Sequence, residues 1–173
     1  MDGPDETRFE GVRVRYGSTK SYHEVVTALL ADIGDQPVPI ADIMATSGDW
    51  ESFARNVEAY EGPSGFMLFA LIDHGAWIRH ADLHRKALRV ILGNPLIAVT
   101  MLRHDVTVGL FAPVEILILD EPDGSSLTYV KPSSLMVLEP NPELLTAAER
   151  LDAKLAAVAA KVTSGSLSER RAP

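Results

Sequence analysis

Residues 65–119 read GFMLFALIDHGAWIRHADLHRKALRVILGNPLIAVTMLRHDVTVGLFAPVEILIL. Three nearly unbroken apolar runs lie in this stretch, and polar residues stand at their ends. Asp73 and His74 end the first run, and Asn94 interrupts the second. The sequences of strands that are buried on both faces are continuous apolar runs of this kind. The pattern therefore predicts a buried sheet with polar side chains at its edges.

Length, charge and cysteine usage limit the classes of protein that this chain fits. Its 173 residues suit one domain with a substantial core. The net charge of −8 disfavours nucleic-acid binding, because contacts to phosphate need a basic surface. With no cysteine, disulfides and thiolate metal sites are excluded. No secretory signal and no apolar run of about 20 residues is found. These features predict a soluble, cytoplasmic protein that binds neither nucleic acid nor membrane.

Hydrophobic periodicity and capping signals predict the order of helices and strands. Strands are expected at 12–16, 65–72 (a central strand), 88–92, 114–119 and 126–130, and helices at 21–33, 49–60, 75–86, 96–102 (wholly buried) and 142–162, with one helical turn within 35–48. Strands and helices are partly segregated, and the last two strands form a hairpin. This order predicts an α+β fold with a single curved, mainly antiparallel sheet of about five strands covered by helices.

The expected organisation is one domain over residues 8–163. Residues 1–7 are expected to be disordered, and residues 164–173 to form a flexible tail. The segment 35–64, rich in turn formers and ending in Glu61-Gly62-Pro63-Ser64-Gly65, is predicted to be a helical insertion.

Several short motifs together point to a known family. They are Ile72-Asp73-His74, Gly93-Asn94-Pro95, Pro113, Asp123-Gly124, Tyr129 and Pro132. With these motifs the core from Phe66 to Pro132 resembles the family called domain of unknown function 302. The resemblance implies a strand, helix, four strands, helix order similar to the TATA-binding-protein-like fold, and it implies a homodimer. It implies no established activity.

The chain also departs from the family pattern at two places. The family has a Lys-Ala-Gly-Thr type of segment after Asn-Pro, where this chain has Leu96 to Val99. The family has a lysine after the proline at 113, where this chain has Glu115. The resemblance therefore implies a pocket beside Asn94 that is more apolar and less cationic than in relatives, and it disfavours an anion held by lysine.

Four polar residues are candidates for catalysis. His74 is a candidate general base or ligand contact, with Asp73 as its orienter; alternatively, Asp73 caps the following segment and His74 bonds a backbone carbonyl. Asn94 could polarise a substrate carbonyl at a helix N-terminus or serve as a plain N-cap. If their strands are parallel, 73–74 and 93–95 share one sheet edge and form a pocket. Glu115 could be a partly buried acid or the partner of a helix or dimer group.

The remaining candidates concern the pocket wall and metal binding. His104 and Asp105 could form an oriented acid/base dyad in which His104 contacts the ligand, or they could belong to a surface loop. His80 and His84 have the spacing of metal ligands on a helix, but no third ligand lies nearby, so no metal is predicted. The basic residues around them are expected to form a solvated helix face. An apolar wall for the ligand is expected from Phe66, Leu68, Leu96, Val99 and Met101.

No glycine-rich nucleotide loop or nucleophile elbow occurs, so no cofactor is predicted. The sequence thus predicts a small-molecule-binding protein, with a cofactor-independent acid/base enzyme as its catalytic form. The substrate would be largely hydrophobic with one or two polar handles. One alternative is a non-catalytic dimeric binding or scaffold protein, and another is a protein with a metal held by histidines. The ligand itself is not identified.

Overall fold

The computed structural model of the protein describes residues 3–165 and contains one open sheet of five strands in the order β1-β5-β4-β3-β2. Every neighbouring pair of strands is antiparallel. The strands are β1 (Arg13–Ser18), β2 (Met67–Asp73), β3 (Ala87–Gly93), β4 (Val114–Glu121) and β5 (Gly124–Val130). The predicted α+β fold with a single antiparallel sheet is confirmed.

Seven α-helices and two short 3-10 helices accompany the sheet within residues 3–165. They are α1 (Tyr22–Ile33), α2 (Ile40–Thr46), α3 (Trp50–Glu58), α4 (His74–Ile78), η1 (Arg79–Ala81), α5 (Pro95–Leu102), η2 (Val106–Phe111), α6 (Pro132–Met136) and α7 (Pro142–Thr163). Within that part of the chain, no helix has both the length and the apolar character needed to cross a membrane. The tail expected to be flexible falls mostly outside the described residues.

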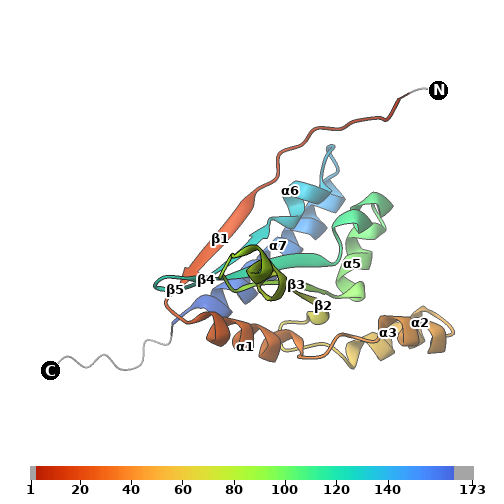
Figure 1. Cartoon of the computed structure of the whole chain (residues 1–173). Helices are drawn as coiled ribbons and strands as arrows, with labels where there is room; N and C mark the ends of the chain where they lie inside the picture. The colour runs from red at the N-terminus through yellow and green to blue at the C-terminus, as the bar shows by residue number, and fades with distance from the viewer. Residues whose placement is uncertain (1–2, 166–173) are drawn as a thin grey trace.

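Helices α1 and α7 cover one face of the sheet (Figure 1). α1 begins with a complete capping box in which Ser21 and Glu24 satisfy each other's backbone amides. Its apolar stripe then packs with the inward residues of α7 and of the central strands. The core residues of these elements include Val25, Leu29, Ile116, Ile118, Leu127, Leu151 and Leu155, all buried.

The first apolar run forms an edge strand, and its prediction as a central strand is wrong. One face of β2 contributes Leu68 to the main core, while Met67 on the other face packs with Val38 and Val57 of the 35–64 segment. The backbone amide of Val38 also donates to the carbonyl of Leu68 at 2.8 Å. The main core and this segment thus bury the start of β2 on its two faces, although only β3 pairs with it, and further along Ile72 is exposed.

Two predicted helices differ from those in the structure. In α5 only Met101 is fully buried, so this helix is less buried than predicted. The helix predicted at 75–86 is shorter in the structure: α4 continues into η1 and ends at Ala81, because Asp82 adopts a left-handed conformation. Arg85 and Lys86 then lie in a connection and Arg89 lies on β3, so the predicted basic helix face does not form.

Candidate functional site

The face of the sheet opposite α1 and α7 carries a groove of about 860 Å³. Residues of four strands line it, together with His74 of α4 and the segments around η2 and α6. Its apolar lining includes Leu110, Phe111, Pro113, Leu117, Leu119 and Val130, and its polar lining includes Arg13, Arg15, His74, Arg89, Glu115 and Thr128. The groove is the candidate functional site.

Strand alternation decides which side chains face the groove, because successive residues of a strand point to opposite faces. On β4 the buried Ile116 and Ile118 point into the core. Glu115, Leu117 and Leu119 between and beside them therefore face the groove. The apolar run of β4 thus supplies both a core layer and the floor of the site.

The edge strand β1 contributes two arginines by the same alternation. Arg13 pairs across the sheet with Val130, and Arg15 pairs with Thr128. Both arginines are exposed, whereas Val14 and Tyr16 pack against the core. The groove therefore has a cationic border along β1, which the sequence analysis does not predict although it places a strand at 12–16.

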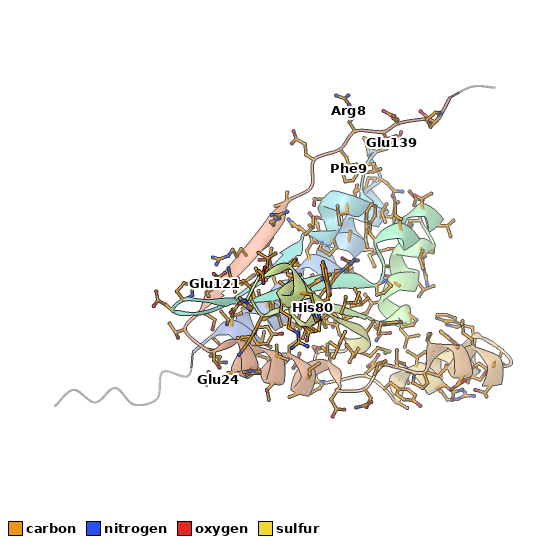
Figure 2. All side chains as sticks on the ribbon, viewed as in Figure 1. Arg8, Phe9, Glu24, His80, Glu121 and Glu139 are labelled. Atoms are coloured by element: carbon orange, nitrogen blue, oxygen red, sulfur yellow. The ribbon has the colours of Figure 1, made fainter. Side chains whose placement is uncertain are left out.

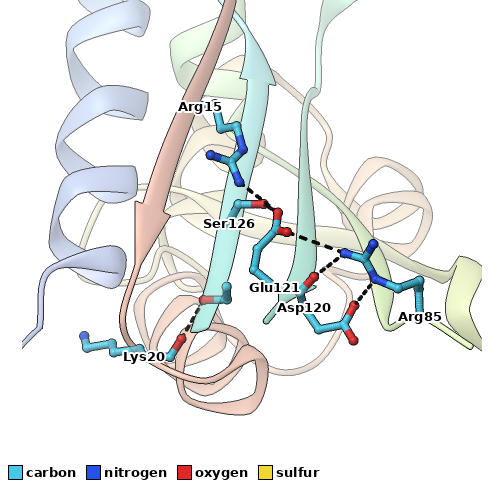
Figure 3. Close-up of polar contacts among 7 residues, drawn as sticks. Arg15, Lys20, Arg85, Asp120, Glu121 and Ser126 are labelled. Atoms are coloured by element: carbon cyan, nitrogen blue, oxygen red, sulfur yellow. Dashed lines mark hydrogen bonds and ion pairs between the residues drawn. The ribbon is translucent and has the colours of Figure 1, made fainter. Parts of the chain in front are cut away.

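Arg15 is held by a polar network at the end of the β4–β5 hairpin (Figure 3). Its guanidinium donates to Glu121 Oε1 at 2.8 Å, and the Ser126 hydroxyl donates to the same oxygen at 2.7 Å. Arg85 lies 3.6 Å from the other oxygen of Glu121 and also pairs with Asp120. The hydrogen bond from Ser126, and after it the one from Arg15, lowers the pKa of Glu121.

This network should make stability depend on pH. The pKa of Glu121 lies below its ordinary value of 4.5 in the folded protein, so acid favours the unfolded state. We expect the free energy of unfolding to fall as the pH drops from about 5 to about 3. Denaturant unfolding at several pH values measures this, and Glu121→Gln should show a weaker fall than the wild type. Equal slopes for the two proteins would contradict the assignment.

Across the groove, Arg89 of β3 pairs with Glu115 of β4. Arg89 Nε donates to Glu115 Oε2 at 2.9 Å, and a second bond joins Nη2 to Oε1. Half of the Glu115 side chain is accessible to solvent, so only the other half is buried. Its partner is a strand residue of the same chain, and the bidentate pair neutralises both charges at this side of the groove.

His74 lines the groove next to this pair. The indole Nε1 of Trp77 donates to His74 Nδ1 at 3.3 Å, which places the proton of a neutral His74 on Nε2. The carboxylate of Asp73 instead accepts from the amide of Ala76 at 3.0 Å and caps α4. Trp77, and not Asp73, is therefore the side chain that orients His74.

The predicted pocket that combines 73–74 with 93–95 does not form. Because β2 and β3 are antiparallel, Asp73 lies opposite Leu88 while Met67 lies opposite Gly93. The two strand ends are consequently at opposite ends of the sheet. His74 and Glu115 line the groove, and Asn94 lies away from them.

Asn94 is buried at the start of α5 with all its polar atoms engaged. Its Oδ1 accepts from the amide of Leu96 at 2.8 Å, which makes it the N-cap of α5. Its Nδ2 donates to Glu61 Oε1 at 2.6 Å and to the carbonyl of Gly65 at 2.8 Å. These bonds tie α5 to the turn that precedes β2.

None of the residues expected to form the apolar wall of the pocket lines the groove. Phe66, Leu68 and Met101 are at most 1% exposed and belong to the main core, so they are closed to a ligand from solvent. Leu96 packs against the smaller buried cluster that Met67 forms with Val38 and Val57. Val99 lies on α5, outside the groove lining. The wall that the groove uses instead comes from β4, β5 and η2.

The remaining histidines are not brought together. His80 (Figure 2) lies on η1, and His84 follows the end of that helix. The i, i+4 spacing therefore no longer places them on one helix face. Within residues 3–165, no group of three or more histidines and carboxylates is suited to a metal ion. His104 is exposed, and Asp105 accepts from the amide and hydroxyl of Thr107 at the start of η2.

Comparison with known proteins agrees with this architecture. The family described as "Domain of unknown function DUF302" matches residues 43–162. The chain belongs to the DUF302 family. The match begins inside the 35–64 segment, so whether that segment is an insertion stays a prediction. Among curated proteins, none matches the chain.

A solved DUF302 structure has the same fold. It is the crystal structure of an uncharacterized conserved DUF302 protein from Bacillus stearothermophilus, with a TM-score of 0.62 and 14% sequence identity. The similarity covers 87% of this chain and 97% of that one. At this identity the likeness shows the fold alone, and the groove has to be interpreted from the residues of this chain.

Two of the DUF302 motif residues quoted above lie in contact in the structure. A Cβ at Gly93 would come within 3.0 Å of the Pro113 side chain, so glycine permits the close approach of β3 to the segment before β4. Pro113 also lines the groove. The close packing of Gly93 and Pro113 thus helps to form one end of the groove.

The N-terminal arm reaches the same end of the groove. Phe9 faces the molecule while Arg8 points away (Figure 2), and the Phe9 ring meets the ring of Phe111 edge-on at 6.2 Å. Gly11 lies against Val130 and Leu135, which both line the groove. The arm therefore borders the groove where its lining is most apolar.

Proposed function

We propose that this DUF302 protein binds a small, largely apolar molecule with polar groups in the groove on the uncovered face of its sheet. The observation that carries the proposal is the groove itself, a concave space of about 860 Å³ with an apolar floor and a few polar side chains around it. Sites for small molecules typically have about 300 to 1,000 Å³ and this division of lining.

The exposed apolar side chains around the groove support the same proposal. Leu110 is 81% exposed at the end of η2, and Val130 is 36% exposed on β5. A ligand lying on Leu117 and reaching this end would cover apolar surface that otherwise faces water. Removing such surface from water contributes about 25 cal/mol per Å².

A charge placed on the floor of the groove should abolish most of the binding. We expect Leu117→Glu to weaken binding of the neutral probe N-phenyl-1-naphthylamine about tenfold, because a carboxylate in an apolar site must lose its hydration. Leu117 lies opposite Arg89 and Thr128, so the new carboxylate has cationic and polar neighbours and the strand should still form. Probe fluorescence, titrated against protein, measures the affinity.

The matched control is Leu145→Glu, since Leu145 is a half-exposed leucine of α7 outside the groove. This variant should bind the probe as the wild type does. Equal affinities of the Leu117 variant and the wild type would show that the probe binds elsewhere, and the proposed site would then be wrong. Energy transfer from Trp77 in a Trp50→Phe background gives an independent position for the probe.

Acid/base chemistry is the catalytic form of this proposal. It is supported by the presence of His74, Arg89 and Glu115 on one groove, with the tautomer of His74 set by Trp77. Any turnover of a bound molecule should be lost in His74→Gln while binding of the naphthylamine probe is retained. Turnover that persists without His74 would contradict the catalytic role of His74 but would not affect the proposal that the groove binds a small molecule.

A homodimer is the second candidate use of this face. The open face exposes Ile72 and Val130, and a second copy packed on it would cover both. Light scattering across a range of concentrations gives the mass. If a dimer forms and Val130→Glu dissociates it, the face serves assembly; if the mass is that of one chain, the groove is free for a ligand.

A further inference from the structure

We infer that the polar group of the ligand is a single anion, a carboxylate in the simplest case, and that Arg13 is its anchor. This inference rests on the proposed function of the groove. It follows from the way in which the charges around the groove are already paired, from the neighbours of Arg13, and from the sign of the charge that the lining leaves over.

The three arginines of the groove differ in what they pair with. Arg89 forms a bidentate pair with Glu115, and Arg15 pairs with Glu121. Arg13 forms no ion pair with any residue of the described chain, 3–165. Arg13 is therefore the groove cation that is available to a ligand.

The surroundings of Arg13 suit the head of an amphipathic molecule. Its strand partner is Val130, and Leu135 and Phe111 also line this part of the groove. An anion at Arg13 would thus lie beside apolar side chains, and the tail of the ligand would extend toward Leu117, which lies across from Thr128 and Arg15. A guanidinium in such partly apolar surroundings binds a carboxylate through two parallel N–H···O bonds.

Further polar groups lie along β1 in the direction of the body of the ligand. Arg15 is two residues from Arg13 on the same face, roughly 7 Å away along the strand. Thr128 lies beside Arg15, and its hydroxyl makes no hydrogen bond within residues 3–165. A ligand held at Arg13 could therefore use the Thr128 hydroxyl as a second polar contact.

The charge balance favours an anion over a cation or a neutral head group. The protein carries a net charge of −8, yet among residues 3–165 the pairs of Arg89 with Glu115 and of Arg15 with Glu121 leave the positive charge of Arg13 in this groove. A local excess of positive charge on an acidic protein attracts small anions and raises their rate of association. The resemblance disfavoured an anion held by lysine beside Asn94; the cation found here is an arginine of β1, at a different place.

The test uses three probes with the same tail and different heads: octanoate, 1-octanol and octylamine. Each is titrated into the full chain, and shifts of the backbone amides of β1, β4 and β5 give both position and affinity. We expect octanoate to bind most tightly. Arg13→Ala should weaken octanoate binding tenfold or more and leave octanol binding unchanged, while Arg13→Lys should retain part of the affinity.

One control variant separates an anchor from an overall effect of charge, and a second variant tests whether Arg15 can assist Arg13. Arg150→Ala removes the same charge from the exposed face of α7 and should leave octanoate binding unchanged. Glu121→Gln should release Arg15 from its pair and strengthen octanoate binding about threefold, in line with the weak energy of exposed ion pairs. A gain of affinity cannot arise from partial unfolding of the variant.

The outcomes distinguish this inference from the proposed function. If octanol binds the groove as tightly as octanoate and Arg13→Ala changes neither, the anchor is wrong and the groove remains a binding site. If none of the three probes shifts the groove amides, both the anchor and the proposed function fail for amphipathic ligands. If the groove amides report self-association instead, a second copy is the occupant and the inference is overturned.

Discussion

Gly124→Ala is expected to lower the free energy of unfolding by about 3 kcal/mol. Gly124 begins β5 with φ at +145°, a conformation that residues with a side chain rarely adopt. A Cβ there would lie 2.0 Å from the carbonyl oxygen of Ser18 and 3.0 Å from the Cα of Thr19. Both atoms belong to the backbone, so relief requires β1 itself to move away from β5.

Gly17→Ala is the matched control for this effect. Gly17 lies on β1 opposite Ser126, with no atom within 4 Å of an added Cβ and no left-handed φ. It should change stability by less than about 0.5 kcal/mol. Denaturant unfolding of both variants measures the difference, and a Gly124 variant as stable as the Gly17 variant would contradict the close approach.

The same substitution links the fold to the site, because β1 carries Arg13 and Arg15. If β1 shifts away from β5 to admit a methyl group at 124, the two guanidiniums move relative to Thr128 and Val130. A destabilised but folded Gly124→Ala should therefore bind octanoate more weakly than Gly17→Ala does. That result would show that Gly124 acts on the groove at a distance, through the position of an edge strand.

Local signals in the sequence predicted local structure well. The helices expected from about residues 21, 96 and 142 form as α1, α5 and α7, and Ser21, Asn94 and Asn141 cap them. The strand expected at 114–119 also forms, as β4, with Glu115 on the face opposite Ile116. Each of these inferences depends on residues a few positions apart, where spacing alone determines which groups can meet.

Non-local pairing could not be predicted in the same way. An apolar run such as 65–72 is the same whether its neighbour is parallel or antiparallel, and that direction decides whether Asp73 and Asn94 share an edge. The pair of Arg89 and Glu115 joins positions 26 residues apart, and the groove combines outward positions of four strands. Only the sheet order brings Arg13 and Leu117 to one face.

Asn94 shows how a residue that looks catalytic in sequence can hold structure together. Asn94→Ala is expected to lower the free energy of unfolding by about 3 kcal/mol. About 1 kcal/mol reflects the lost cap of α5, and the rest reflects the carbonyl of Gly65 and the carboxylate of Glu61, which lose their shared donor. Asn94→Asp keeps the cap but places a carboxylate against these two acceptors. Its free energy of unfolding should therefore be no higher than that of Asn94→Ala.

Asn141→Ala isolates the extra contribution, since Asn141 is the N-cap of α7 through the same kind of bond to Leu144 at 3.0 Å. It should cost about 1 kcal/mol, the usual value for a lost N-cap. The difference between the two alanine variants then measures the bonds of the Asn94 amide nitrogen. Because Asn94 lies outside the groove, a folded Asn94→Ala should bind N-phenyl-1-naphthylamine with wild-type affinity. Loss of probe binding at full stability would instead return Asn94 to the functional site and place the ligand beside α5.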